Sequence, residues 1–223
     1  MDDIPIEKII RSRRRSIALI ITPSARLIVR APLRAPSEVI NAVIQEKEGW
    51  IRKKLAEMKG RPQATVHRYE EGEIFYFLGR AYPLHIVDDG RAAIERTDRL
   101  CVSCTLEPEI AGWIQRWYVL EAEKEIRSRC MWFSMTTGYT PASIRISNAR
   151  GRWGSCTSKG GISFSWCLVQ APMEIVDYVV VHELVHLAHH NHSRQFWDRV
   201  REIMPDYERR RKWLRENERL LRI

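Results

Sequence analysis

The sequence lacks an apolar run long enough to cross a membrane. Roughly 18 to 20 consecutive apolar residues are needed to span a bilayer, and no such run occurs among the 223 residues. The segment SIALIIT (16–22) follows the basic run RSRRR, but it is too short for the core of a signal peptide, which needs about 7 to 15 apolar residues and a small-residue cleavage site. We therefore expect a cytoplasmic protein with no membrane partner.

Cysteine is also scarce. The five cysteines are an odd number, and they are scattered from position 101 to position 167, which excludes a dense disulfide scaffold. The pair in CVSC (101–104) has no second Cys-x-x-Cys or His-x3-His pair with which to complete a structural zinc site. We expect these two cysteines to lie on a short strand. Internal repeats and low-complexity linkers are absent as well.

Acidic residues are fewer than basic ones. The chain has 37 Lys and Arg against 28 Asp and Glu, a net charge of +9. This balance favours an anionic partner such as a nucleotide, a nucleic acid or an acidic protein surface, without choosing among them. The run RSRRR (11–15) could bind phosphate, whereas ERRRKWLRENERLLR (208–222) alternates its charges as a solvated helix face does.

Residues 1–105 read as a β-rich region with one helix. Strand-like apolar runs occur in 4–31 and again in 73–104, with Asp89-Gly90 as a hairpin turn. Between them, apolar residues at helical spacing predict one amphipathic helix from Pro36 to Met58.

Residues 106–223 read as a second region with a different pattern. Apolar residues at helical spacing predict a long helix over 108–135, and two strands follow at 142–149 and 161–170. Pro172 begins a further helix, which holds most of the histidines. The predicted fold class is α+β, with a long helix, a small antiparallel sheet and a histidine-bearing helix in this second half.

His182, Glu183 and His186 form a His-Glu-x-x-His motif on that helix. Positions i and i+4 lie about 40° apart and about 6 Å along a helix, so both imidazoles can bind one metal ion. Glu183 is displaced around the helix toward the place of an attacking water, whose pKa zinc lowers toward about 7. The apolar residues around the motif would make unpaired histidines and a glutamate costly to bury.

A catalytic zinc ion takes three protein ligands, so a third is needed. His189 and His190 lie too far along a straight helix, and we expect surface roles for them. His192 can reach the metal if the chain leaves the helix, and Asn191 is a residue type that accepts the left-handed conformation of such a turn. His192 is therefore favoured, with Glu202 or Glu208 as the alternative.

Two segments, HELVHLAHHNHSRQFW (182–197) and RGRWGSCTSKGGISFSWCLVQAP (150–172), resemble the YgjP-like (DUF45) family of zinc metallopeptidases, which is related to the WLM (Wss1-like) group. The resemblance extends over nearly the whole chain. It implies a zincin-like catalytic half in which His182, His186 and His192 bind zinc and Glu183 is the general base. In such a fold a strand beside the active helix aligns an extended peptide, and 161–170 is the candidate strand.

The remaining site residues are less constrained by the sequence. Arg152, Ser155 and Lys159 are candidates for binding an anionic part of the substrate, and the oxyanion could be stabilised by Tyr178, Arg152 or Tyr207. Four aromatic residues are expected to be plain core packing, namely Trp153, Trp166, Phe196 and Trp197.

Three functions are compatible with these residues. The first is a zinc-dependent peptidase acting on a protein or peptide. The second is a metal-dependent nucleotide pyrophosphohydrolase, which the resemblance admits and the basic glycine-rich segment GRWGSCTSKGG (151–161) suits, although no Walker motif is present. The third is a nucleic-acid-binding protein with a structural metal, which ranks last because a closed structural site normally has four protein ligands.

Overall fold

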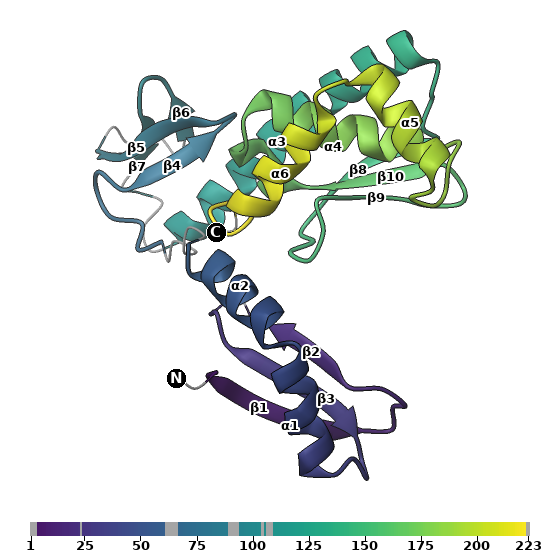
Figure 1. The fold of residues 1–223 in the computed structure, drawn as a ribbon. Helices are drawn as coiled ribbons and strands as arrows, with labels where there is room; N and C mark the ends of the chain where they lie inside the picture. Colours follow the sequence, from purple (N-terminus) through teal and green to yellow (C-terminus); the bar gives the residue numbers. More distant parts are fainter. Residues whose placement is uncertain are drawn as a thin grey trace. The chain divides into compact units, whose positions relative to one another are not determined.

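The computed structural model of the chain describes residues 4–22, 24–60, 67–88, 94–103, 105 and 109–221. Contacts divide the chain into two compact units, Met1–Pro62 and Gln63–Ile223, and each unit has its own hydrophobic core. Figure 1 labels the helices and strands of both units. The boundary that the sequence suggested near residue 105 lies within the second unit.

The first unit is a three-stranded sheet with two helices. The strands are β1 (Ile6–Ser12), β2 (Ala18–Ile21) and β3 (Leu27–Pro32), and the helices are α1 (Ser37–Glu46) and α2 (Glu48–Lys59). The central strand β3 is parallel to β1 and antiparallel to β2. Alternate residues of β3 are buried, as in a strand with one covered face.

The single helix predicted from Pro36 to Met58 is divided in the structure. Lys47 has φ −98° and ψ 10°, which ends α1 and begins α2. Ile40 and Ile44 of α1 enter the same hydrophobic core as Ile51 of α2. The prediction failed because the apolar residues keep helical spacing across the break, so the sequence pattern does not show it.

The second unit begins with a four-stranded sheet. Its strands are β4 (Ile74–Phe77), β5 (Arg80–Val87), β6 (Ile94–Arg96) and β7 (Leu100–Ser103), in the order β4-β5-β7-β6. Asp89 and Gly90 lie outside the described residues, and β5 pairs with β7 rather than with β6. Cys101 is a free thiol on the short strand β7, in agreement with the strand predicted for CVSC. Cys104 is not among the described residues.

This sheet shares one hydrophobic core with the rest of the second unit. Phe75, Phe77 and Val102 are buried in the same cluster as residues of α3 (Ile110–Thr137). The hydroxyl of Tyr118 on α3 donates a hydrogen bond of 2.6 Å to the carbonyl of Tyr76. The sheet and α3 are packed together, so the described residues before and after position 105 belong to one unit.

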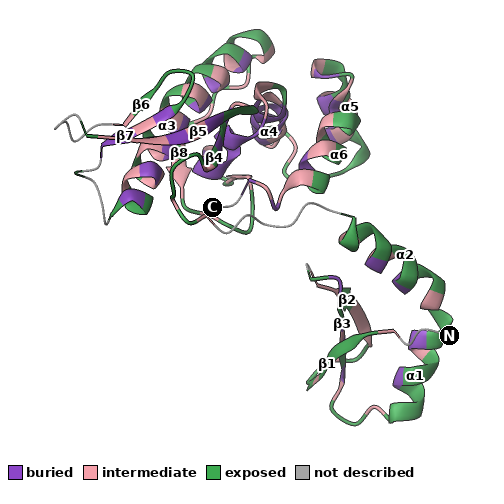
Figure 2. Ribbon diagram, turned by 90° about the vertical axis from the view of Figure 1, so that its left-hand side faces the viewer, coloured by how far each residue is buried: buried purple, intermediate pink, exposed green. Residues whose placement is uncertain are grey.

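The remaining elements include a buried central helix. They are β8 (Ser143–Ser147), β9 (Gly154–Cys156), β10 (Gly161–Ser165), the short 3-10 helix η2 (Trp166–Gln170), α4 (Met173–Val185), α5 (Arg194–Ile203) and α6 (Tyr207–Asn217). Val180, Val181 and Val185 of α4 are almost fully buried, and Figure 2 shows α4 as the helix with the most continuous buried surface. A helix that is apolar on all sides belongs in a core.

The last three-stranded sheet lies over this helix and has the order β8-β10-β9. It is mixed rather than wholly antiparallel, because β10 is antiparallel to β9 but parallel to β8. The strand predicted over 161–170 ends at Ser165, and the buried residues of η2 complete that segment. The α+β class is confirmed. Among the described helices, none is both long and apolar enough to cross a membrane.

Candidate metal centre and catalytic cleft

Three histidine side chains converge at the end of α4. The helix ends at Val185, and His186 caps it with φ −63° and ψ −18°, so His182 and His186 keep the i, i+4 relation of a helix. The ligand nitrogens of His182, His186 and His192 all lie within 4.8 Å of one another. The three ring centroids are 4.7 to 5.0 Å apart.

His192 reaches this cluster by a different route from the one the sequence suggested. Asn191 does not have a positive φ, so the prediction of a left-handed turn there is wrong. The helix has already ended at Val185, and the carbonyl of Val185 accepts hydrogen bonds from the N–H groups of Ala188 and His189. The side chain of Asn191 instead accepts a hydrogen bond of 3.2 Å from the N–H of Ser193, just before α5.

The alternative third ligands are engaged elsewhere. Glu202 accepts a hydrogen bond of 2.9 Å from Arg199 on α5. Glu208 forms an ion pair of 3.3 Å with Arg201 and accepts a hydrogen bond from Tyr207. Within the part of the chain that the structure describes, the metal-compatible cluster consists of the three histidines alone.

The nitrogen atoms of this cluster are arranged as a cation would require. Nε2 of His192 lies 3.0 Å from Nε2 of His182, so two acceptor nitrogens face each other unless a proton or a metal ion lies between them. Nδ1 of His186 lies 2.8 Å from the carbonyl of His189, and donation to that carbonyl leaves Nε2 of His186 as the free lone pair. Nδ1 of His182 is buried, and no described group bonds to it. The donor set fits zinc.

Burial favours the neutral forms of His182 and His186. Burial, followed by the neighbouring His186 and His192, lowers the pKa of His182 to about 3. Burial is also the main cause that lowers the pKa of His186. A neutral imidazole has the lone pair that a metal ion needs.

Two aromatic residues of α5 support the histidines. Phe196 is fully buried, and its ring centroid lies 4.5 to 4.9 Å from those of all three imidazoles. Trp197 stacks on His192 at 5.6 Å, Tyr207 stacks on Trp197 at 5.4 Å, and the guanidinium of Arg211 lies 4.5 Å from the Trp197 ring. Because His192 is on an exposed loop, this stack is what holds its ring in place.

The expectation of plain core packing therefore holds for only part of the aromatic set. Trp166 is a buried core residue, and its ring stacks with that of Tyr118. Phe196 is also a buried core residue, and it packs against the histidines as well. Trp197 is partly buried and stacks on His192, and Trp153 lines a cavity beside His182. The spacing HxxxFW (192–197) carried this signal, since it places both rings within one turn of the third histidine.

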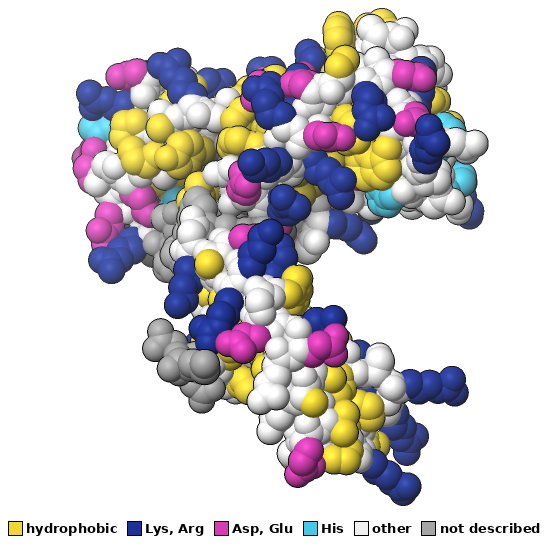
Figure 3. All heavy atoms as spheres, in the orientation of Figure 1, with side chains coloured by type: hydrophobic (Ala, Val, Ile, Leu, Met, Phe, Trp, Pro, Cys, Tyr) yellow, Lys and Arg dark blue, Asp and Glu magenta, His cyan; other side chains and the backbone are white. Residues whose placement is uncertain are grey.

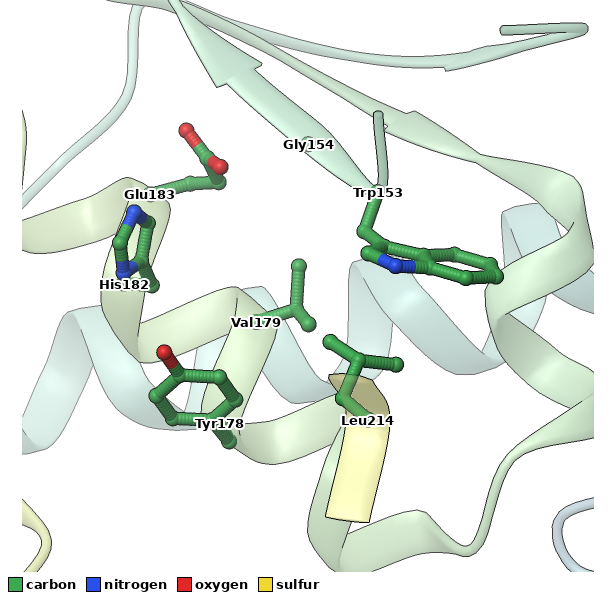
Figure 4. A pocket seen from close by; sticks show the side chains of 7 residues that line it. All are labelled: Trp153, Gly154, Tyr178, Val179, His182, Glu183 and Leu214. Carbon is green, nitrogen blue, oxygen red and sulfur yellow. The ribbon is translucent and has the colours of Figure 1, made fainter. Parts of the chain in front are cut away.

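Glu183 lies under the edge strand β9. A Cβ atom built at Gly154 would lie only 2.5 Å from Oε1 of Glu183, so a glycine is needed for this approach. Figure 4 shows the carboxylate directed toward β9 near Gly154. Burial raises the pKa of Glu183 to about 7, against the opposing positive charge of Arg152. Oε2 is buried and has no hydrogen-bond partner among the described residues.

The histidines and Glu183 open into one cleft of about 400 Å³. One wall is formed by β9 and the turn after it. The other wall is formed by the end of α4 and the loop that follows it, up to His192. The lining residues are Gly154, Ser155, Cys156, Ser158, His182, Glu183, His186, His190 and His192. The space-filling view shows histidine side chains at the surface near α5 (Figure 3).

The strand that lines the cleft is not the one the sequence suggested. Segment 161–165 is the central strand β10, and β9 is the edge strand beside the active helix. Sequence reasoning missed β9 because it has only three residues, Gly-Ser-Cys, without the alternation of apolar and polar residues that marks a strand. Gly154 was the available signal, because glycine within a strand often marks a close approach.

A second cavity of about 230 Å³ shares Gly154, His182 and Glu183 with the cleft. Figure 4 shows Trp153, Val179 and Leu214 as its apolar walls, with Tyr178 beside His182. Burial raises the pKa of Tyr178 to about 12, so its hydroxyl remains a donor. Of the three oxyanion candidates, Tyr178 lines this cavity, whereas Tyr207 and Arg152 do not line it.

The remaining predicted residues are divided between the cleft and a third cavity. Arg152 and Lys159 line a third cavity, of about 440 Å³, and they are not in the lining of the cleft with the histidines. Ser155 lines both. His190 lines the cleft, and His189 serves through its carbonyl, which accepts the hydrogen bond from His186.

Comparison with known proteins assigns the chain to a family. No curated protein matches the chain. Among solved structures, the crystal structure of the metallopeptidase zymogen of Pyrococcus abyssi abylysin is similar, with 22% sequence identity, a TM-score of 0.36, and coverage of 41% of this chain and 97% of that chain. The family model described as "YgjP-like, metallopeptidase domain" matches residues 15–217. The chain therefore belongs to the YgjP-like metallopeptidase family.

Proposed function

We propose that this protein is a zinc-dependent peptidase that hydrolyses peptide bonds in the cleft between β9 and the histidine helix. The observation that carries the proposal is that the three histidines and Glu183 line one cleft beside an edge strand. His182, His186 and His192 would hold the zinc ion. The ion, when bound, supplies a Lewis acid for the scissile carbonyl and lowers the pKa of water.

Glu183 is the proposed general base. Its buried Oε2, which has no partner among the described residues, is the atom that would take the proton from the attacking water. The same carboxyl would then deliver a proton to the leaving amine. A pKa of about 7 suits both steps, because the group can be ionised or protonated near neutral pH.

The edge strand β9 is the proposed substrate platform. One edge of β9 pairs with β10, and the described strands leave its other edge unpaired. An extended peptide can add to such an edge through main-chain hydrogen bonds. This pairing would align the scissile bond between β9 and the histidines, where both walls of the cleft can contact it.

Nucleotide hydrolysis remains the competing hypothesis from the sequence. It would require cations beside the metal to hold the phosphate oxygens. Arg152 and Lys159 line another cavity, so the geometry favours the peptide.

The test is to incubate the zinc-loaded protein separately with an unfolded polypeptide and with nucleoside triphosphates. We expect cleavage of the polypeptide, lost on addition of a chelator and restored by zinc. Hydrolysis of triphosphates without cleavage of any polypeptide would overturn the proposal.

A further inference from the structure

The outer face of the β8-β10-β9 sheet carries a basic cavity of about 440 Å³. Three cations line it, namely Arg145 on β8, Arg152 before β9 and Lys159 in the turn after β9. Ser143, Ser155 and Ser163 add hydroxyl groups, and no carboxylate is in the lining.

Strand register places this cavity on the side of the sheet away from the core. Ser163 of β10 pairs with Arg145 of β8 and with Ser155 of β9, so these three residues share one face. The alternating residues Ile162 and Phe164 are buried on the other face, where Gly154 contacts Glu183. The basic cavity and the catalytic carboxylate therefore lie on opposite faces of the same strand.

The cations of this cavity form no salt bridge with a described residue, and the one described acidic group on which any of them has an electrostatic effect is Glu183, which Arg152 influences. Arg145, Arg152 and Lys159 are exposed, and none forms a hydrogen bond or an ion pair with another residue that the structure describes. Like charges gathered beside hydroxyl donors favour an anion such as a carboxylate or a phosphate.

Ser155 connects this cavity to the catalytic cleft, because it lines both. Side chains alternate between the two faces of a sheet with a period of two. In a peptide paired with β9, residues next to Gly154 and Cys156 would face Glu183, and the residue next to Ser155 would face the cations. Side chains directly opposite each other on paired strands lie about 4.5 to 5.5 Å apart at Cβ.

We propose that this basic cavity is a specificity subsite that selects an acidic or phosphorylated side chain close to the scissile bond. The inference rests on the proposed peptidase function and names a substrate class for it. Arg152 and Lys159 flank β9 and would contact the anion, while Arg145 forms the far wall.

The test compares two peptides that differ only by Glu or Gln at one position, scanned across the scissile bond. We expect kcat/KM to favour Glu by about tenfold at one position. The preference should fall to about twofold or less in Arg152→Gln and in Lys159→Gln. The positive charge of Arg152 also lowers the pKa of Glu183. Both peptides are cleaved with the same Glu183, so this effect cancels in the ratio of their kcat/KM values.

Lys124→Gln is the matched control, since Lys124 is an exposed cation on α3 outside the cavity. We expect it to keep the preference for Glu. Lys159→Glu should reverse the preference toward a peptide with Lys at the same position. A Glu-to-Gln ratio near one at every position, or one that the Arg152 and Lys159 variants leave unchanged, would overturn the proposal.

A binding measurement separates this proposal from the peptidase function. Fluorescence anisotropy of labelled Glu and Gln peptides on the full-length Glu183→Gln protein reports affinity without cleavage. Tighter binding of the Glu peptide that Lys159→Gln removes would support the subsite even if neither peptide is cleaved by the parent protein. Equal binding of both peptides would contradict the subsite.

Discussion

Gly154 and Glu183 are in van der Waals contact across the catalytic cleft, and a single added methyl group would place a carbon 2.5 Å from Oε1 of the carboxylate. Real Cβ contacts are not this short, so either the strand or the carboxylate would have to move. The contact fixes Glu183, the proposed general base, against the strand proposed to bind the substrate.

Gly154→Ala should therefore lower kcat by about a hundredfold, because small displacements of a catalytic group have effects of that size. Zinc content should stay at the parent level, since the three atoms nearest to the added methyl group all belong to Glu183. The matched control is Gly151→Ala, where a Cβ atom meets nothing within 4 Å. Equal activity in the two variants would show that the contact does not position Glu183.

Glu183→Gln should lower kcat by about a hundredfold to ten-thousandfold, the range attributed to general acid–base catalysis. The amide has nearly the same shape but cannot accept a proton from water. Steady-state peptide hydrolysis by zinc-loaded protein is the measurement, with metal content checked in the same sample. Turnover close to the parent value would exclude Glu183 as the base.

Trp197→Leu should weaken zinc binding by about 10- to 100-fold, the effect typical of residues that orient metal ligands. The ring of Trp197 stacks on His192, and Leu cannot replace that contact. Trp197→Phe should recover much of the affinity, because it keeps an aromatic face. Competition with a chromogenic chelator gives the affinities. Trp132→Leu, on the exposed surface of α3, should leave zinc affinity unchanged.

Asp177→Asn should destabilise the second unit by roughly 2 kcal/mol. Arg129 on α3 donates hydrogen bonds of 2.5 and 2.9 Å to Asp177 on α4, and the side chains are 26% and 14% exposed. Breaking a fully buried ion pair costs roughly 3 to 5 kcal/mol, and we expect a smaller loss here because both side chains are partly exposed. Urea unfolding of the full chain is the measurement.

The control for this ion pair is Glu123→Gln. Glu123 pairs with Arg127 one helical turn away, and both side chains are more than 40% exposed. Its loss should cost about 0.5 kcal/mol or less. An equal loss of unfolding free energy in both variants would show that the Arg129–Asp177 ion pair stabilises the protein no more than an exposed pair does.

The cluster of three histidines could be predicted because helix geometry alone brings His182 and His186 together, and the chain needs only a short loop to return His192. The route of that loop could not be predicted, since it depends on where α4 ends and on the aromatic packing of α5. A left-handed Asn191 was a plausible local solution that the tertiary packing does not use.

The edge strand and the basic cavity were beyond sequence reasoning for a different reason. Three residues of β9 carry no periodicity, and its role comes from pairing with β10. Pairing also decides that Ser155 faces away from Gly154 and Glu183, and Arg152 and Lys159 line the cavity on the Ser155 side, although sequence proximity suggested one common site. Alternation along a strand separates neighbours in sequence onto two faces, and the register is known only once the partners are.

Zinc stoichiometry measured on purified protein by elemental analysis, after equilibration with zinc and removal of the excess, tests the central claim most directly. The parent should hold one zinc ion per chain, and His192→Ala should lose most of it. His190→Ala, which removes an exposed histidine that lines the same cleft but is outside the cluster, should keep the full amount. Full zinc content in His192→Ala, with loss in Glu202→Ala or Glu208→Ala instead, would contradict the account.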